Sequence, residues 1–172
     1  MKNYRLFQFL IVFLFAQCYP APKLAGQFTE QEFETMATEM AQGDTRDIEV
    51  ATLKEMKEKV ILLDTREKKE YEISHIPGAI WVGYNNFKLK RVKEIAKDAK
   101  IVTYCSVGYR RERIGEKLQN AGFTDVSNLK GSIFKWVNEG NPIVDKDEQP
   151  TEKVHGFDKT WGKWVKGEKA VY

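Results

Sequence analysis

Apolar and polar positions along residues 47–139 follow the rhythm of an α/β domain. Compact apolar runs rich in β-branched residues occur at 60–63 and 101–104, as is typical of strands buried on both faces of a sheet. Shorter strands are predicted at 48–50, 79–82 and 126–129. Helical spacing predicts helices over 52–59, 67–72, 87–97, 111–121 and 133–139. Strands alternating with helices through short connections predict a largely parallel sheet with helices on both faces.

A segment on each side of this domain has a pattern of its own. Residues 23–46 contain Thr29 and Glu32 at capping-box spacing before an amphipathic stretch, so they predict a helical arm that packs on the domain and carries no chemistry. Residues 146–172 begin as a polar linker and continue as an aromatic and basic tail. We expect Trp161 and Trp164 to dock on the domain, with a partner or a membrane surface as the alternative.

The first 18 residues have the pattern of a signal peptide. Lys2 and Arg5 precede an apolar run that is too short for the roughly 20 residues needed to span a bilayer. Small and turn-forming residues follow, so we expect cleavage near 16–18 and export to the periplasm or the exterior. An uncleaved anchoring segment is one alternative. Lipidation at Cys18 is another, although Gln17 occupies a position where a small residue is usual.

The composition is that of a globular protein, with 42% hydrophobic and 31% charged residues. Its formal net charge of +3 falls when residues 1–18 are removed, because 26 basic residues then face 25 acidic ones. A nearly neutral chain gives no reason to expect a nucleic-acid partner. The sequence also lacks metal-ligand spacing, a nucleotide-binding loop and a dinucleotide fingerprint, so we expect neither a metal nor a cofactor.

Cys105 is the one thiol expected in the exported chain, because the other cysteine is Cys18. It directly follows the predicted strand 101–104, at the edge of the sheet where open α/β folds bind ligands. The short loop after it can turn backbone N–H groups inward, and the helix N-terminus and Arg110 add positive potential. Each effect favours thiolate over thiol and would hold an anionic group. A lone cysteine can also be a small core residue.

Four segments in order give the chain a resemblance to the rhodanese family. They are Leu-Asp-Thr-Arg-Glu at 63–67, Ser-His-Ile-Pro-Gly-Ala-Ile at 74–80, Cys-Ser-Val-Gly-Tyr-Arg at 105–110, and Leu-Lys-Gly-Ser-Ile at 129–133 with Trp136 just after. The resemblance implies a rhodanese-like α/β domain over 47–145, with a five-stranded, mostly parallel sheet and helices on both faces. It also implies a cysteine that cycles through a persulfide.

The same resemblance assigns roles within the loop. It implies that Cys105 is the nucleophile and that the substrate is cradled by Ser106, Val107, Gly108, Tyr109 and Arg110. The Arg110 side chain would also help to hold an anionic donor. Among sulfurtransferases of the family this loop has six residues, as here, whereas phosphatase and arsenate reductase relatives have one more. The loop length therefore weighs against phosphoryl chemistry.

Residues outside the loop are assigned supporting roles. Asp64 and Arg66 match the first motif, and we interpret them as braces beside the loop, with a purely structural ion pair as an equal alternative. His75 matches a histidine that stabilises a turn, so we do not expect it to act as a base. Ser74 and Ser132 stand where glycine is common in the family, which changes local backbone freedom without removing a reacting group.

These observations predict a sulfurtransferase that moves sulfane sulfur from a donor such as thiosulfate to a thiol or cyanide acceptor. A protein acceptor is an open alternative, and we expect a monomer. Two other functions are weighed beside it, namely a rhodanese-like module that binds or relays sulfur without turnover, and a phosphatase or arsenate reductase. The sequence does not identify the physiological donor or acceptor.

Overall fold

A computed structural model describes residues 27–172 and confirms the predicted fold. The expected signal peptide, with Cys18, lies outside the described residues. Five parallel strands form one sheet in the order β1-β5-β4-β2-β3. Their bounds are Asp47–Ile48 for β1, Ile61–Asp64 for β2, Ile80–Trp81 for β3, Lys100–Tyr104 for β4 and Asp125–Leu129 for β5. The central strands β4 and β2 are the apolar runs that the sequence identifies most clearly.

Each face of the sheet has its own apolar core, because successive residues of a strand point to opposite sides. Leu62 packs with α1 (Glu30–Met40), α2 (Val50–Met56) and α5 (Ser132–Asn138). Leu63, its neighbour, packs with α4 (Tyr109–Asn120) on the other face. Helix α3 (Lys68–Ile73) follows β2, and two 3-10 turns, η1 (Lys57–Lys59) and η2 (Leu89–Val92), complete the connections. The helical arm is thus part of one core rather than an appendage, since its Phe33 is 1% exposed.

Several predicted bounds are wrong. The helix expected over 87–97 is only the turn η2, because its basic residues repel one another at helical spacing and Val92 alone among residues 88–93 is buried. The strand expected at 48–50 stops at Ile48, since Val50 already begins α2. Helix α4 begins at Tyr109 rather than at residue 111. Arg110 therefore lies in the first helical turn.

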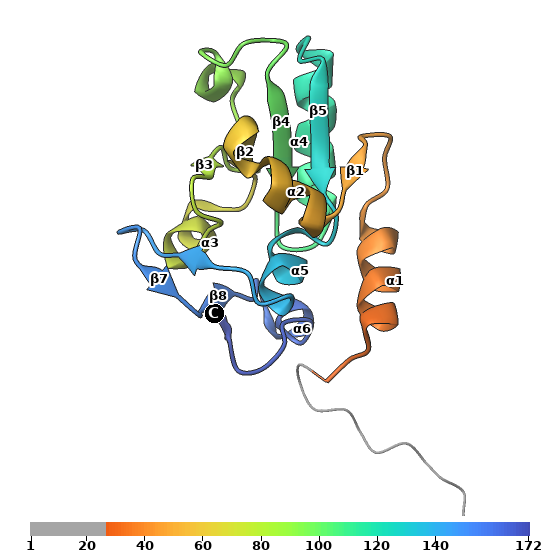
Figure 1. Ribbon diagram of the computed structural model, residues 1–172, viewed down its shortest axis with the longest axis vertical. Helices are drawn as coiled ribbons and strands as arrows, with labels where there is room; N and C mark the ends of the chain where they lie inside the picture. Colours follow the sequence, from red (N-terminus) through yellow and green to blue (C-terminus); the bar gives the residue numbers. More distant parts are fainter. Residues whose placement is uncertain (1–26) are drawn as a thin grey trace, which may run out of the picture.

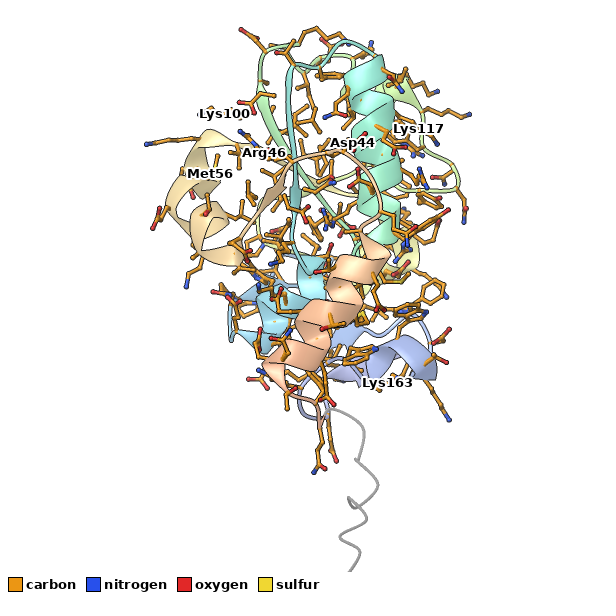
Figure 2. All side chains as sticks on the ribbon, turned by 90° about the vertical axis from the view of Figure 1, so that its right-hand side faces the viewer. Asp44, Arg46, Met56, Lys100, Lys117 and Lys163 are labelled. Atoms are coloured by element: carbon orange, nitrogen blue, oxygen red, sulfur yellow. The ribbon has the colours of Figure 1, made fainter. Side chains whose placement is uncertain are left out.

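The predicted tail, residues 146–172, is folded, and we call it the C-terminal segment. Short strands β6 (Ile143–Val144) and β7 (Pro150–Thr151) pair antiparallel, and β8 (Val154–His155) pairs in parallel with β9 (Ala170–Val171). Helix α6 (Lys159–Gly162) lies between β8 and β9. In Figure 1, β8 and α6 lie below the carboxyl ends of the sheet strands. Figure 2 shows Lys100, where β4 starts, and Lys163, just after α6, at opposite ends of the molecule. No helix within 27–172 is long and apolar enough to cross a membrane.

Candidate active site

A pocket of about 410 Å³ lies where the carboxyl end of β4 meets the C-terminal segment. Cys105, 2% exposed, borders it, and so does every other residue of the predicted loop, Ser106, Val107, Gly108, Tyr109 and Arg110. The remaining lining residues come from α1, from the segments after β2 and β3, and from the C-terminal segment: Met40, Glu67, Tyr84, Asn85, Phe157 and Trp161. The structure therefore brings all the predicted loop residues into one pocket.

The loop keeps its shape because its carbonyl groups are held on the side of α5. The N–H of Ile133 donates to the Cys105 carbonyl and that of Phe134 donates to the Ser106 carbonyl, both at 3.2 Å. On the other side, a side chain at Gly108 would come within 3.2–3.3 Å of the backbone at the C-terminal end of α1. A larger residue at 108 would force the loop and this backbone apart by a few tenths of an ångström. Helix α1 therefore packs against the loop, in addition to packing on the domain as expected.

The backbone N–H groups of the loop are free to bind a ligand. Within residues 27–172, no carbonyl or side chain accepts a hydrogen bond from the backbone N–H of residues 106–111. Three of these groups, those of Tyr109, Arg110 and Arg111, belong to the first turn of α4, where the helix dipole favours negative charge. Successive free N–H groups beside a helix N-terminus can bind an anion, and we call this group of donors the N–H nest. The nest is adjacent to Cys105 in the chain.

Ser132 contacts the cysteine directly. Its Oγ accepts a hydrogen bond from the Cys105 N–H at 3.1 Å and lies 3.8 Å from Cys105 Sγ, within donating distance of sulfur. Its backbone is left-handed, with φ at 54°, and follows Gly131 at 67°. Left-handed backbone is costly for residues other than glycine, so Ser132 occupies a strained position. Serine lacks the backbone freedom of glycine at this position but supplies a hydroxyl group close to Cys105 Sγ.

Arg110 is held by an acid that the sequence analysis did not identify. Its guanidinium donates to both carboxylate oxygens of Glu70, at 2.6 and 2.8 Å, and to Ser106 Oγ at 2.9 Å. Ser106 Oγ in turn donates to Glu70 at 3.2 Å. A bidentate pair of this kind fixes geometry as well as charge. The pair therefore ties the loop to α3, and the donor-binding role expected for Arg110 stays a prediction.

The ionisation of Glu70 follows from these contacts. Burial disfavours its charged form, but the hydrogen bonds and charge of Arg110, together with the charge of Arg66, outweigh burial and lower its pKa to about 2. Burial likewise lowers the pKa of Arg110, while its bond to Glu70 and the negative charges of Cys105 and Glu70 raise it overall. Both partners stay ionised across the physiological range.

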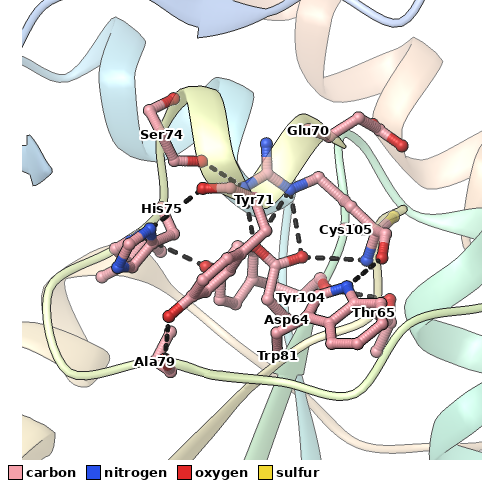
Figure 3. Close-up of polar contacts among 12 residues, drawn as sticks. Asp64, Thr65, Glu70, Tyr71, Ser74, His75, Ala79, Trp81, Tyr104 and Cys105 are labelled. Atoms are coloured by element: carbon pink, nitrogen blue, oxygen red, sulfur yellow. Dashed lines mark hydrogen bonds and ion pairs between the residues drawn. The ribbon is translucent and has the colours of Figure 1, made fainter. Parts of the chain in front are cut away.

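Asp64 and Arg66 form a fully buried pair below the loop, as Figure 3 shows for Asp64 beside Tyr104 and Cys105. Their side chains meet at 2.6 Å, and Arg66 Nη2 also donates to the Ser74 carbonyl at 2.6 Å. Neither residue borders the pocket. Their link to the site runs through the charge that Arg66 places near Glu70. A brace beside the loop and a purely structural ion pair both fit this arrangement, so the role of the two residues stays a prediction.

The part of the chain that carries this site matches a known family. The model of the rhodanese-like domain matches residues 49–139. The chain belongs to the rhodanese-like family. A tRNA uridine(34) hydroxylase from Buchnera aphidicola is 40% identical over 87 residues, covering 48% of this chain and 28% of that protein. This chain therefore spans less than a third of the length of that curated relative.

Solved structures support the rhodanese-like fold. The rhodanese-like domain of the Alr3790 protein from Anabaena sp. has a TM-score of 0.55 and 24% identity, covering 59% of this chain and 80% of that one. Thiosulfate sulfurtransferase from Pseudomonas aeruginosa has a TM-score of 0.53 and 21% identity, covering 69% of this chain and 23% of that one. At these identities the likeness concerns the fold alone.

His75 has a structural place in this rhodanese-like domain. Its Nδ1 lies 3.0 Å from the Tyr71 carbonyl and its Nε2 lies 3.0 Å from Glu148, while its ring stacks on that of Tyr71. Figure 3 shows His75 and Cys105 on opposite sides of the buried network. The contacts join the end of α3 to the C-terminal segment, as expected for a residue that stabilises a turn.

Sequence reasoning missed the site residues that come from outside the rhodanese motifs. Glu70 follows Glu67 at capping-box spacing, which indicates a helix start but not a partner for Arg110. Phe157 and Trp161 lie in the tail, where the aromatic content indicated docking but not its place. Met40 lies at the end of the arm. Within 27–172 no group of three or more His, Cys, Asp or Glu residues could hold a metal ion.

Proposed function

We propose that this rhodanese-like protein is a sulfurtransferase with Cys105 as its nucleophile. The Cys105 thiolate attacks the outer sulfur of a donor such as thiosulfate. A bond forms between Sγ and that sulfur as the donor S–S bond breaks, and sulfite leaves with the electron pair. A thiolate or cyanide acceptor then attacks the outer persulfide sulfur, which restores the Cys105 thiolate. No proton transfer is required in either step.

The nest of free N–H groups beside Cys105 is the observation that carries this proposal. The persulfide formed on Cys105 has a terminal sulfur that bears a negative charge, and the departing sulfite is also anionic. The backbone N–H groups of residues 106–111 have no acceptor within the described residues and are available to donate to both, and such donors stabilise charge as it develops. Ser132 adds a hydroxyl close to Sγ.

The pairing of Arg110 supports sulfur transfer over phosphoryl transfer. A phosphatase needs donors around a tetrahedral oxyanion with two or three charges. Here the guanidinium already binds Glu70 through both of its terminal nitrogens. The six-residue length of the loop also favours sulfur transfer over phosphoryl transfer. A module that only relays sulfur would share the first step of the proposed reaction, so turnover distinguishes it.

We do not propose that this chain hydroxylates tRNA. That name belongs to much longer proteins, and the match covers 28% of the one from Buchnera aphidicola. The proposal is therefore confined to what the cysteine of the matched domain can do. From residues 1–18 we also propose that the protein is exported. We further propose that it acts as a monomer on a small donor and a thiol-bearing acceptor, with no nucleic acid.

Intact mass spectrometry tests the proposal. Incubating the exported form without residues 1–18, in which Cys105 is the one thiol, with thiosulfate should add the mass of one sulfur atom, and cyanide should remove it as thiocyanate. Cys105→Ser should abolish both changes and thiocyanate turnover while keeping the melting curve, because the change replaces only the sulfur atom. A stoichiometric gain without turnover would indicate a relay module. No gain with a folded protein from either thiosulfate or an organic thiosulfonate, or an equal gain in Cys105→Ser, would refute the proposal.

A further inference from the structure

Two rings from the C-terminal segment border the pocket at Cys105, those of Phe157 and Trp161. We call them the aromatic wall. The family model matches residues 49–139, so the aromatic wall comes from a part of the chain beyond the matched domain. Its position next to the reactive loop indicates that this added segment shapes what the pocket accepts.

The segment that carries the aromatic wall is firmly anchored. Val154 and Val165, on either side of it, are buried in the same core as α1 and α5. Between them Asp158 caps α6 by accepting hydrogen bonds from the N–H groups of Thr160 and Trp161, at 2.7 and 3.1 Å. The wall is therefore a fixed surface rather than a loose tail.

The conformation of Phe157 indicates that its ring has a role beyond packing. Its φ is 66°, in the left-handed region that bulky residues rarely occupy. Its side chain is about half exposed, so little core burial compensates. The ring instead lies at the pocket, with its centroid 5.3 Å from the Arg110 guanidinium carbon. A strained residue that contributes little to the core is a sign of a binding surface.

The rest of the pocket favours an apolar ligand beyond the N–H nest. Met40, Tyr84 and Tyr109 add thioether and aromatic surface. Of the two charged lining residues, Arg110 is neutralised by Glu70 and Glu67 is an acid. A dianionic donor therefore gains little from side-chain charge and is repelled by Glu67. A donor with an aromatic or bulky apolar group would gain from burial and ring contacts.

We infer that the sulfur donor of this protein is an organic sulfane-sulfur compound with an aromatic or bulky apolar group, held between the N–H nest and the aromatic wall. The inference rests on the proposed sulfurtransferase function. For a thiosulfonate donor, the Cys105 thiolate attacks the outer sulfur and forms the Sγ–S bond. The donor S–S bond breaks and the sulfinate leaves with the electron pair, so charge balances without a proton or a further reactant.

Three donors separate the contribution of the ring from that of charge. Benzenethiosulfonate and methanethiosulfonate share the reacting group and a single charge, while thiosulfate carries two charges and no carbon. The rate constant for persulfide formation on the full chain is measured by intact mass for each donor. We expect benzenethiosulfonate to react about tenfold faster than methanethiosulfonate, the upper range for one added aromatic contact, and thiosulfate to be slowest.

Phe157→Asn is the key variant, because asparagine tolerates the left-handed backbone while removing the ring. It should bring the ratio of the benzenethiosulfonate to the methanethiosulfonate rate toward one, and Trp161→Ala should do the same. Leu89→Ala, at a similarly exposed apolar residue outside the pocket lining, should keep the ratio of the original chain.

The outcomes distinguish this inference from the proposed function. If no donor loads Cys105, the sulfurtransferase proposal itself fails. If all three donors load Cys105 at similar rates, or if folded Phe157→Asn keeps the full preference, the sulfurtransferase proposal stands and the inference about the donor is overturned. A melting curve for each variant establishes that it is folded.

Discussion

The guanidinium of Arg110 has two possible uses in the site, and its contacts favour one of them. It can attract an anionic donor by charge, or it can hold the loop in shape through Glu70 and Ser106. The second use needs a planar group with two parallel donors, which lysine lacks. The bidentate contacts at 2.6 and 2.8 Å indicate this use.

Arg110→Lys separates these two uses, because it keeps the charge and removes the two parallel N–H donors, which we call the fork. If the fork holds the loop, persulfide formation should slow ten- to a hundredfold, in line with about 1.5–3 kcal/mol for a charge-assisted bond. The slowing should be equal for thiosulfate and methanethiosulfonate. Arg113→Lys, on the exposed side of the same helix, serves as the control and should react normally. A rate close to that of the original chain in Arg110→Lys would instead favour attraction by charge.

Sequence reasoning reaches Cys105 and its loop but not their immediate partners, for a physical reason. The loop is contiguous, and its chemistry follows from a thiol placed between a buried strand and a helix. Glu70 is one of several acids in a charged helix, and nothing local distinguishes it from a solvated residue. Ser132 was noted as a departure from glycine, yet its contact with Sγ depends on how α5 meets β4.

At the scale of elements, the turn that presents Phe157 depends on a histidine. The buried His155 accepts a hydrogen bond at Nδ1 from the Phe157 N–H, at 2.9 Å. Burial lowers the pKa of His155 from 6.5, and the charges of Lys69, Arg66 and Arg110 lower it further, while Glu70 opposes them. Since Nδ1 is the acceptor, protonation there removes this hydrogen bond.

The sign of the pH effect follows from this lowered pKa. The unfolded chain takes up a proton at His155 near pH 6.5, whereas the folded chain resists it, so the stabilisation is complete above 6.5 and declines as the pH falls below that value. Urea unfolding at pH 7.5, 6.5 and 5.5 should show the decline. His155→Asn, whose amide oxygen can accept the same hydrogen bond, should flatten it. The stabilisation that ionised Glu70 provides is lost only below about pH 4.5, so it does not change between pH 7.5 and 5.5.

Elements with a strong apolar pattern were predicted well, and weakly patterned ones were not. The strands β2 and β4 are buried on both faces, so each is a continuous apolar run. The stretch 87–97 has helical spacing but almost no buried face, and tertiary packing supplies most of the stability of a short helix. The bounds of β1 failed because Ile48 and Val50 fit both a strand and a helix start.

At the scale of the molecule, the two ends of the described chain pack on each other. Trp164, in the C-terminal segment, has its ring centroid 5.4 Å from that of Phe28, just before α1, and 6.3 Å from that of Phe33, within it. The same two regions border the pocket through Met40, Phe157 and Trp161. No local pattern could have predicted this contact, because it joins residues far apart in the sequence.

This packing predicts that α1 and the C-terminal segment unfold together with the rhodanese-like domain. Trp164→Ala should lower the free energy of unfolding by about 2–3 kcal/mol, below the 3–5 kcal/mol of a fully buried ring because Trp164 is partly exposed. At about 2–4 °C per kcal/mol, the melting temperature should fall several degrees in one transition. Phe28→Ala should lower the free energy of unfolding by less than Trp164→Ala does.

A double-mutant cycle shows whether the two rings act as a pair. Combined, Phe28→Ala and Trp164→Ala should cost about 0.5–1.5 kcal/mol less than the sum of the single changes, since their edge-on contact is lost only once. Leu89→Ala paired with Trp164→Ala provides the additive control. Strictly additive costs for the ring pair, or a separate early transition for the C-terminal segment, would contradict a single cooperative unit. A single cooperative unit would hold the aromatic wall in place beside Cys105.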